Sequence, residues 1–271
     1  MSVRNRRVLQ LHVRGDMTWR TDDLSVEEPL EIRVNGQAAS VTMRTPGSDF
    51  DLAVGFLITE GVIARAGDIV HMRMCPQADA GSDGLNVVEV SLGEGALTAP
   101  AHRNFYTTSS CGVCGKASID AVRTASQYSV REDPLTVTPA LLASLPGKLR
   151  GAQAMFARTG GLHAAALFNS AGELVCLRED VGRHNAFDKV IGWAATQQLL
   201  PLRSHLILAS GRASFELTQK ALMAGIPLLA AVSAPSSLAV DLAGEAGMTL
   251  VGFLRGEQMN VYAGHDRVQR G

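Results

Sequence analysis

The second half of the chain alternates short, wholly apolar segments with segments of helical periodicity. Residues 206–209, 228–232 and 249–254 are predicted to form buried strands, and predicted helices over residues 213–224 and 236–246 separate them. Strands that are apolar on both faces need cover on both sides, and helical connections place consecutive strands parallel. The pattern therefore predicts an α/β domain whose mostly parallel sheet lies between two layers of helices.

Two more strands are expected to make this sheet mixed. Residues 162–168 and 173–178 are predicted strands, and the turn between them is so short that the two strands must be antiparallel. A predicted helix over residues 138–145 precedes this pair, and a longer one over residues 183–200 follows it with an apolar stripe on one side. The second half therefore favours a mixed three-layer α/β sheet.

The first half of the chain is more strand-rich. Residues 28–44 alternate apolar and polar side chains around Asn35-Gly36, which is typical of a β-hairpin with a two-residue turn. We expect a small α+β domain over residues 1–134 and the larger α/β domain over residues 135–271. The other elements predicted in the small domain are the helix 51–60, the strands 69–74 and 86–92, and the helix 116–127.

Composition and charge limit the partners of the chain. Hydrophobic residues make up 46% and charged residues 19%, as in globular proteins, and the formal net charge of -1 gives no indication of binding to nucleic acid or to a membrane. No apolar run follows the arginines at positions 4, 6 and 7, so residues 1–15 are expected to be a solvated tail. Four cysteines make no disulfide scaffold, so we expect a cytoplasmic protein with reduced thiols.

Two of these cysteines form a Cys-x-x-Cys motif in a stretch rich in glycine and hydroxyl residues. Cys111 and Cys114 are followed by Gly115 and Lys116. A cysteine next to a lysine or at a helix start loses its proton more readily, and the thiolate is the nucleophilic form. The motif therefore predicts a reactive sulfur on a flexible loop.

Three kinds of chemistry use such a pair, and the motif alone does not separate them. A zinc site needs four ligands, whereas Cys75 and Cys176 each stand alone, so we expect no bound metal. A dithiol oxidoreductase usually carries the motif after a strand, but here an irregular segment precedes it. A sulfur carrier needs one nucleophilic cysteine that accepts a sulfur atom as a persulfide and presents it elsewhere.

Two predicted helices carry an arginine in their first turn, where the helix dipole disfavours a positive charge. These residues are Arg183 and Arg212. A bound anion would resolve the conflict, because phosphate pairs with arginine and accepts hydrogen bonds from the free N–H groups of a helix start. The alternative is a structural ion network, and the sequence leaves both open. The candidate carboxylates of that network are Glu179, Asp180 and Glu216.

Four further side chains near these segments have a predicted place. His184 and Asp188 are one helical turn apart and can touch, as an acid/base pair or, as we favour, as a structural contact. His163 opens a predicted strand after two glycines, where it can line a cleft. Cys176 lies in an apolar strand and is predicted to belong to the core.

Several motifs together resemble the FdhD family of sulfur carrier proteins, which formate dehydrogenase activity requires. The resemblance extends over residues 44–262, and its most specific parts are the cysteine motif and the block 179–189. The matching stretches are Arg44-Thr-Pro-Gly47, Ala53-Val-Gly-Phe-Leu57 with Glu60-Gly61, Ser110-Cys-Gly-Val-Cys-Gly115, Thr159-Gly-Gly161, Glu179-Asp-Val-Gly-Arg-His-Asn-Ala186 with Asp188-Lys189, and Ser210-Gly-Arg212 with Ser214-Phe-Glu216.

The resemblance implies a fold similar to cytidine deaminases, preceded by a small α+β domain. Zinc deaminases carry His-x-Glu and Pro-Cys-x-x-Cys at their two helix starts. Here the corresponding segments are Asp180-Val-Gly-Arg183 and Ser210-Gly-Arg212. Because the metal ligands are missing, deamination is not expected, although a nucleotide-shaped cleft is.

The resemblance also implies a sulfurtransferase that takes sulfur from a cysteine desulfurase as a persulfide on Cys111, with Cys114 as an auxiliary residue. The acceptor would be the molybdenum cofactor, a bis-molybdopterin guanine dinucleotide, before it enters formate dehydrogenase. A homodimer is expected. The alternatives are a cofactor-binding chaperone without sulfur transfer and a thiol oxidoreductase. The implied cofactor-binding residues are Phe253, Leu254, Arg255, Gly256, Glu257 and Gln258, with Arg183 and Arg212 as further anion contacts.

Overall fold

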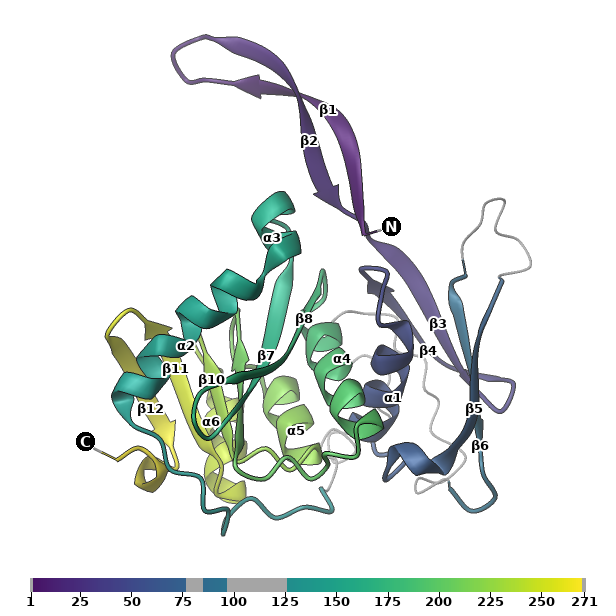
Figure 1. The fold of residues 1–271 in the computed structure, drawn as a ribbon, viewed down its shortest axis with the longest axis vertical. Helices are drawn as coiled ribbons and strands as arrows, with labels where there is room; N and C mark the ends of the chain where they lie inside the picture. Colours follow the sequence, from purple (N-terminus) through teal and green to yellow (C-terminus); the bar gives the residue numbers. More distant parts are fainter. Residues whose placement is uncertain (1, 77–84, 97–125, 270–271) are drawn as a thin grey trace.

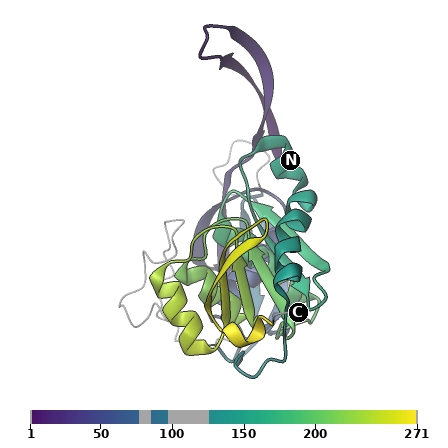
Figure 2. The same ribbon diagram turned by 90° about the vertical axis from the view of Figure 1, so that its left-hand side faces the viewer.

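A computed structural model describes residues 2–76, 85–96 and 126–269. The described residues form a six-stranded sheet, a four-stranded sheet and a two-stranded ribbon, with helices around and between the sheets (Figures 1 and 2). Cys111, Cys114 and nearly all of the helix predicted over residues 116–127 lie outside the described residues.

The six-stranded sheet is mixed, as the sequence predicts. Its strand order is β12-β11-β10-β9-β7-β8. Strands β9, β10 and β11 are parallel, whereas β12 and the pair β7 and β8 are antiparallel to their neighbours. The strands are β7 (His163–Asn169), β8 (Leu174–Asp180), β9 (His205–Ala209), β10 (Leu228–Ala231), β11 (Thr249–Arg255) and β12 (Gln258–Ala263).

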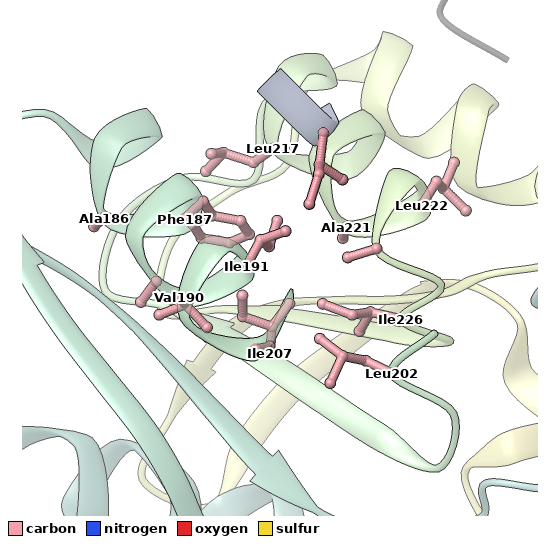
Figure 3. Close-up of a cluster of buried hydrophobic side chains, with 14 of the residues drawn as sticks. Ala186, Phe187, Val190, Ile191, Leu202, Ile207, Leu217, Ala221, Leu222 and Ile226 are labelled. Atoms are coloured by element: carbon pink, nitrogen blue, oxygen red, sulfur yellow. The ribbon is translucent and has the colours of Figure 1, made fainter. Parts of the chain in front are cut away.

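Helices cover both faces of this sheet and give the predicted layers. Successive strand residues point to opposite faces, so Phe168 packs in a cluster with α2, whereas its neighbour Leu167 packs in a cluster with α4. Figure 3 shows part of the second cluster, in which Phe187 and Ile191 of α4 lie over Ile207 of β9. The helices are α2 (Pro139–Ala152), α3 (Ala154–Thr159), α4 (Arg183–Thr196), α5 (Phe215–Met223) and α6 (Ser237–Ala246).

The four-stranded sheet has the order β4-β3-β6-β5 and begins with the predicted hairpin. Asn35 and Gly36 have φ of 49° and 79°, as a two-residue hairpin turn requires. Leu30 of this sheet shares one hydrophobic cluster with α1, α4 and Ile207, so the two predicted domains contribute to a common core. The elements are β3 (Glu28–Val34), β4 (Gln37–Arg44), α1 (Asp49–Thr59), η1 (Ala66–Asp68), β5 (Ile69–Cys75) and β6 (Val87–Leu92).

Helices α1 and α4 cross at two glycines, and this contact joins the two sheets (Figure 1). A Cβ atom on Gly55 would lie 1.9 Å from the carbonyl oxygen of Asp188, and one on Gly192 would lie 1.8 Å from that of Asp51. Only residues without a side chain therefore permit this backbone separation.

The N-terminal residues form a ribbon, so the prediction of a solvated tail is wrong. Strands β1 (Val3–Leu11) and β2 (Met17–Ser25) pair antiparallel along their full length, and we call residues 3–25 the arm. The arm extends away from the rest of the molecule (Figures 1 and 2). Most side chains along both strands of the arm are exposed, and neither strand has a buried face. The alternation of buried apolar and exposed polar residues that usually predicts a strand is therefore missing.

Helix α2 continues beyond the predicted end at residue 145 and contains Pro146. Its first turn begins as predicted, because the Thr138 side chain accepts a hydrogen bond from the backbone N–H of Leu141. Burial of Leu142, Leu145 and Leu149 against the sheet compensates for the proline. No helix within the described ranges combines the length and the apolar character needed to cross a membrane.

Candidate functional site

The carboxyl ends of four strands of the six-stranded sheet lie along one edge. The carboxyl ends of β8, β9, β10 and β11 lie there together with the amino end of β7, because β7 is antiparallel to both β8 and β9. Helices α4 and α5 follow β8 and β9, so their amino ends lie at the same edge. Ligands of α/β sheets usually bind at such an edge.

Two cavities lie at this edge and share His163 and Val181 as walls. The larger has a volume of about 540 Å³ and the smaller about 110 Å³, and we call the two together the cleft. The larger cavity has mainly apolar walls, whereas the walls of the smaller combine charged and polar groups with apolar ones. Residues lining the larger cavity include Leu149, Phe156, Leu162 and Val232, and those lining the smaller include Glu27, Met43, Arg183 and His184.

Arg183 lies in the first turn of α4 and lines the smaller cavity. Its Nε atom is buried and has no hydrogen-bond partner in the described part of the chain. The N-cap residue Gly182 offers no side chain to the free N–H groups of the first turn. A buried donor without a partner costs free energy, and an anion in the smaller cavity would supply the missing acceptor.

The carboxylates proposed for a structural ion network are engaged elsewhere. Glu179 accepts hydrogen bonds from the backbone N–H groups of Met155 and Phe156, at 3.0 and 2.7 Å, at the start of α3. Glu216 lies 4.0 Å from His184. Among the residues that the structure describes, neither Arg183 nor Arg212 makes an ion pair, so the structural ion network that the sequence left open as an alternative is not present there.

Asp180 instead forms a buried network that fixes the loop between β8 and α4. Its carboxylate lies 2.7 Å from Nζ of Lys189 and accepts hydrogen bonds from the backbone N–H groups of Gly182 and Thr45 and from Nδ2 of Asn185. Lys189 also donates to the carbonyl oxygen of Thr45 at 2.8 Å. These bonds join α4 to the end of β4 and hold the segment that carries Arg183.

His163 lies between the two cavities, which places it in the predicted cleft. Burial and the positive charge of Arg183 lower the pKa of its imidazole, and the carboxylate of Asp180 only partly opposes them. The ring is therefore neutral at pH 7 and can accept or donate one hydrogen bond. Ser210, also on the wall of the larger cavity, accepts a hydrogen bond from the N–H of Ala164.

The other residues predicted to bind the cofactor lie near this edge but differ in exposure. Arg212 is exposed and lines neither cavity. Residues 253–258 form the end of β11 and its turn into β12, where Leu254 is buried in the core and Phe253 is exposed with φ of 51°. Nε of Arg255 donates to the carbonyl oxygen of Val232, a residue of the cleft wall, at 2.9 Å.

Two other predicted side chains have structural roles. Asp188 is buried and bonds to Lys220 and Thr59, both at 2.8 Å, so it makes a structural contact as favoured, but with partners other than the expected His184. Cys176 is buried in β8, as predicted, and burial raises the pKa of its thiol to about 11. It is therefore a protonated core residue.

No group of three or more potential metal ligands occurs within the described ranges. Because Cys111 and Cys114 lie outside them, the expectation of no metal at the cysteine motif stays a prediction.

Several residues that line the cleft were not predicted. Glu27 and Met43 come from the region of the four-stranded sheet, and Arg150 and Phe156 come from α2 and α3. The guanidinium of Arg150 lies over the Phe156 ring, 4.2 Å from its centroid. Tertiary packing brings these residues together, and no local pattern in the sequence signals it.

Comparison with known proteins gives consistent matches over nearly the whole chain. A sequence model of the FdhD/NarQ family matches residues 25–269. The sulfur carrier protein FdhD of Mycolicibacterium paratuberculosis is 58% identical over 273 residues, which cover 99% of this chain and 100% of the relative. That of Streptomyces coelicolor is 60% identical over 258 residues, with coverages of 94% and 92%.

The fold is also similar to that of a solved structure. A protein of Desulfotalea psychrophila described as a formate dehydrogenase accessory protein superimposes with a TM-score of 0.77 at 23% identity. The match covers 99% of this chain and 100% of the other.

Proposed function

Because the chain belongs to the FdhD/NarQ family, we propose that it is a sulfur carrier that serves formate dehydrogenase. The observation that supports this most strongly is the 58% identity, along 99% of the chain, to a protein named as a sulfur carrier. Sulfur carriage also needs the kind of nucleophilic cysteine that the motif at residues 111–114 provides.

Cys111 is proposed to accept the sulfur atom. Its thiolate attacks the terminal sulfur of a persulfide on a cysteine desulfurase, and the sulfur–sulfur bond of that persulfide breaks. The desulfurase cysteine leaves as a thiolate, and Cys111 becomes the persulfide, so the exchange needs no added oxidant or reductant. Cys114 assists as an auxiliary thiol, and the enzyme class is a sulfurtransferase.

The proposed acceptor is the molybdenum cofactor, a bis-molybdopterin guanine dinucleotide, held in the cleft. The unpartnered Nε of Arg183 and the uncapped start of α4 suit its phosphates. The apolar walls of the larger cavity suit a ring system. Arg212 and residues 253–258 would extend the contact along the same edge. We also propose that this cleft is similar to that of cytidine deaminases, which holds a nucleoside.

The carrier function is tested by mass spectrometry of the intact protein after incubation with a cysteine desulfurase and cysteine. We expect an adduct of one sulfur atom on the wild type and on Cys114→Ala, and none on Cys111→Ala. Cys176→Ala is the matched control, because its thiol is buried and should not carry sulfur. A wild type without an adduct would favour a chaperone that only binds the cofactor.

The cleft is tested separately with guanosine diphosphate. Loss of the Arg183 guanidinium should weaken binding about tenfold or more, because a charge-assisted hydrogen bond to phosphate is lost. Arg203→Ala removes an exposed arginine near the start of β9, at the opposite edge of the sheet, and should leave the affinity unchanged. Equal affinity of wild type and Arg183→Ala would reject the proposed phosphate site. Insulin reduction without nucleotide binding would instead favour a thiol oxidoreductase.

The proposal also names the sulfur donor, the recipient, the compartment and the assembly of the protein. The donor is a cysteine desulfurase, the recipient is formate dehydrogenase, and the protein acts in the cytoplasm as a homodimer. The description of the Desulfotalea psychrophila protein, which has a similar fold, supports formate dehydrogenase as the proposed recipient.

A further inference from the structure

Gln153 is the most deeply buried polar side chain on the wall of the larger cavity, with only 3% of its surface exposed. Its side-chain amide carries both donors and an acceptor, but it makes no hydrogen bond within the described ranges. Most buried polar groups in folded proteins have a partner, because an unpaired one costs free energy. A bound molecule would supply the missing partners.

The local fold leaves this amide available. Helix α2 ends directly before Gln153 and α3 begins directly after it. A residue in this position often caps the following helix with its side chain. Here the carboxylate of Glu179 instead accepts hydrogen bonds from the first free N–H groups of α3, those of Met155 and Phe156. The Gln153 amide is therefore not needed for capping, and it lines the cavity instead.

The surroundings of the amide suit a planar ring. Leu149 and Val232 give the cavity apolar walls, and the Phe156 ring has the guanidinium of Arg150 over it, 4.2 Å from the centroid. Planar heterocycles stack on aromatic and guanidinium planes. The volume of about 540 Å³ lies in the range of about 300–1,000 Å³ that is usual for ligand pockets. A ring between such walls can present its polar edge to Gln153.

We propose that Gln153 binds the lactam edge of the guanine base, which is the adjacent pair of ring C=O and ring N–H. The amide N–H donates to the ring carbonyl, and the amide oxygen accepts from the ring N–H, so both polar groups are satisfied at once. The inference rests on the proposed cofactor-binding function of the cleft, and it names the residue that recognises the base.

The pterin of the cofactor carries the same lactam edge. Guanine is the ring assigned to the cavity, because the pterin is joined to the metal-binding sulfurs, which must stay open to the incoming sulfur atom. An enclosed cavity suits the end of the ligand at which no bond changes.

The two cavities then hold different parts of one ligand. The smaller has a volume of about 110 Å³, which is below the usual size of a ligand pocket, and Arg183 with its buried Nε lines it. His163 and Val181 are walls of both cavities, so a ligand can extend past them from one into the other. The base therefore lies in the larger cavity beside Gln153, and the phosphates lie in the smaller one beside Arg183.

Gln153→Leu removes the amide and keeps the packing. The leucine side chain lies among apolar walls and the unpaired polar group is gone, so the ligand-free variant should melt at the same temperature as the wild type or higher. Thermal unfolding followed by circular dichroism measures this. A melting temperature lowered by several degrees would overturn the proposal, because it would show that the amide has a structural partner.

Isothermal titration calorimetry with guanosine diphosphate tests the contact itself. Gln153→Leu should bind this ligand about tenfold more weakly than the wild type, because a pair of hydrogen bonds is lost. Gln197→Leu is the matched control, since Gln197 is exposed at the carboxyl end of α4, whereas the amino end of α4 lies at the cleft. Its affinity should be unchanged. A Gln153→Leu variant that keeps its affinity for guanosine diphosphate but loses affinity for biopterin would overturn the assignment to guanine.

A ligand without the ring N–H separates direct recognition from a general disturbance of the cleft. In 1-methylguanosine diphosphate a methyl group replaces this hydrogen. The wild type should prefer guanosine diphosphate about tenfold, whereas Gln153→Leu should bind the two ligands alike. An undiminished preference in Gln153→Leu would overturn the proposal.

These measurements also separate this inference from the proposed function on which it rests. A wild type that does not bind guanosine diphosphate would reject the proposed cleft, and this inference with it. Weaker binding by Arg183→Ala together with unchanged binding by Gln153→Leu would reject the role of Gln153 alone.

Discussion

At the level of single residues, two buried acids near the cleft are paired, whereas one buried arginine Nε has no partner among the described residues. Asp180 and Asp188 are both buried acids, but each is neutralised by a lysine, Lys189 or Lys220. Arg183 is the contrasting case, because its buried Nε has no partner within the described ranges. We therefore expect the binding chemistry of the cleft to depend on Arg183, whose Nε is available to a bound anion.

Removal of one member of the Asp188–Lys220 pair should destabilise the protein strongly. Lys220→Met leaves the buried carboxylate of Asp188 without its partner, which costs about 3–5 kcal/mol. Urea denaturation followed by circular dichroism measures the change. Asp188→Asn/Lys220→Met should cost less than the sum of the two single changes, and strict additivity would contradict the pairing.

His163 should make stability depend on pH. Burial and Arg183 lower the pKa of its imidazole below the value of about 6.5 for an unfolded histidine. The unfolded chain therefore takes up the proton first, and the contribution of His163 to stability falls as pH decreases from that value toward the lowered pKa. His163→Gln should reduce the loss of stability between about pH 7.5 and pH 5.5, and an unchanged pH profile would contradict the assignment.

Cys176 should resist alkylation in the native protein. Burial raises the pKa of its thiol to about 11, so very little thiolate is present near pH 8. Iodoacetamide labelling followed by peptide mass mapping should find Cys176 unmodified in buffer and modified in urea. Rapid labelling of the native protein at Cys176 would show that β8 is more open than its packing indicates.

At the level of elements, the close contact between α1 and α4 helps to hold the two sheets together. Gly192→Ala places a methyl group within 1.8 Å of the backbone of Asp51, so one helix must move. We expect a loss of about 1–3 kcal/mol, as for other overpacked cores, in a chemical denaturation experiment. Gly151→Ala in α2 meets nothing within 4 Å and should be neutral or stabilising. Equal effects of the two changes would contradict the close crossing.

The elements that the sequence predicts well are those with a buried face. The hairpin at residues 28–44 and the strands β7, β8, β9 and β10 follow from alternation, turn residues and apolar runs. Helix α2 extends past its predicted end because packing of Leu149 outweighs Pro146. The arm escapes prediction because its apolar residues face solvent rather than a core.

At the level of the whole molecule, the cleft illustrates how far sequence reasoning extends. His163 and Arg183 were predictable, because two glycines precede the strand that His163 opens and because the helix dipole disfavours an arginine in the first turn of a helix unless an anion binds there. Glu27 and Phe156 come from distant elements, and only the assembled fold brings them to the same cavity. The resemblance to the family assigns the sulfur to Cys111, which lies outside the described residues. The proposed carrier function therefore needs a direct assay of this residue.

The most direct assay is restoration of formate dehydrogenase activity in cells that lack their own sulfur carrier. The wild-type chain is predicted to restore activity, and Cys111→Ser is predicted to leave it at the background level, because serine cannot hold a transferable sulfur. Cys75→Ser, matched in residue type and checked for equal protein level, is predicted to restore activity like the wild type. Full activity with Cys111→Ser would contradict sulfur carriage on this residue.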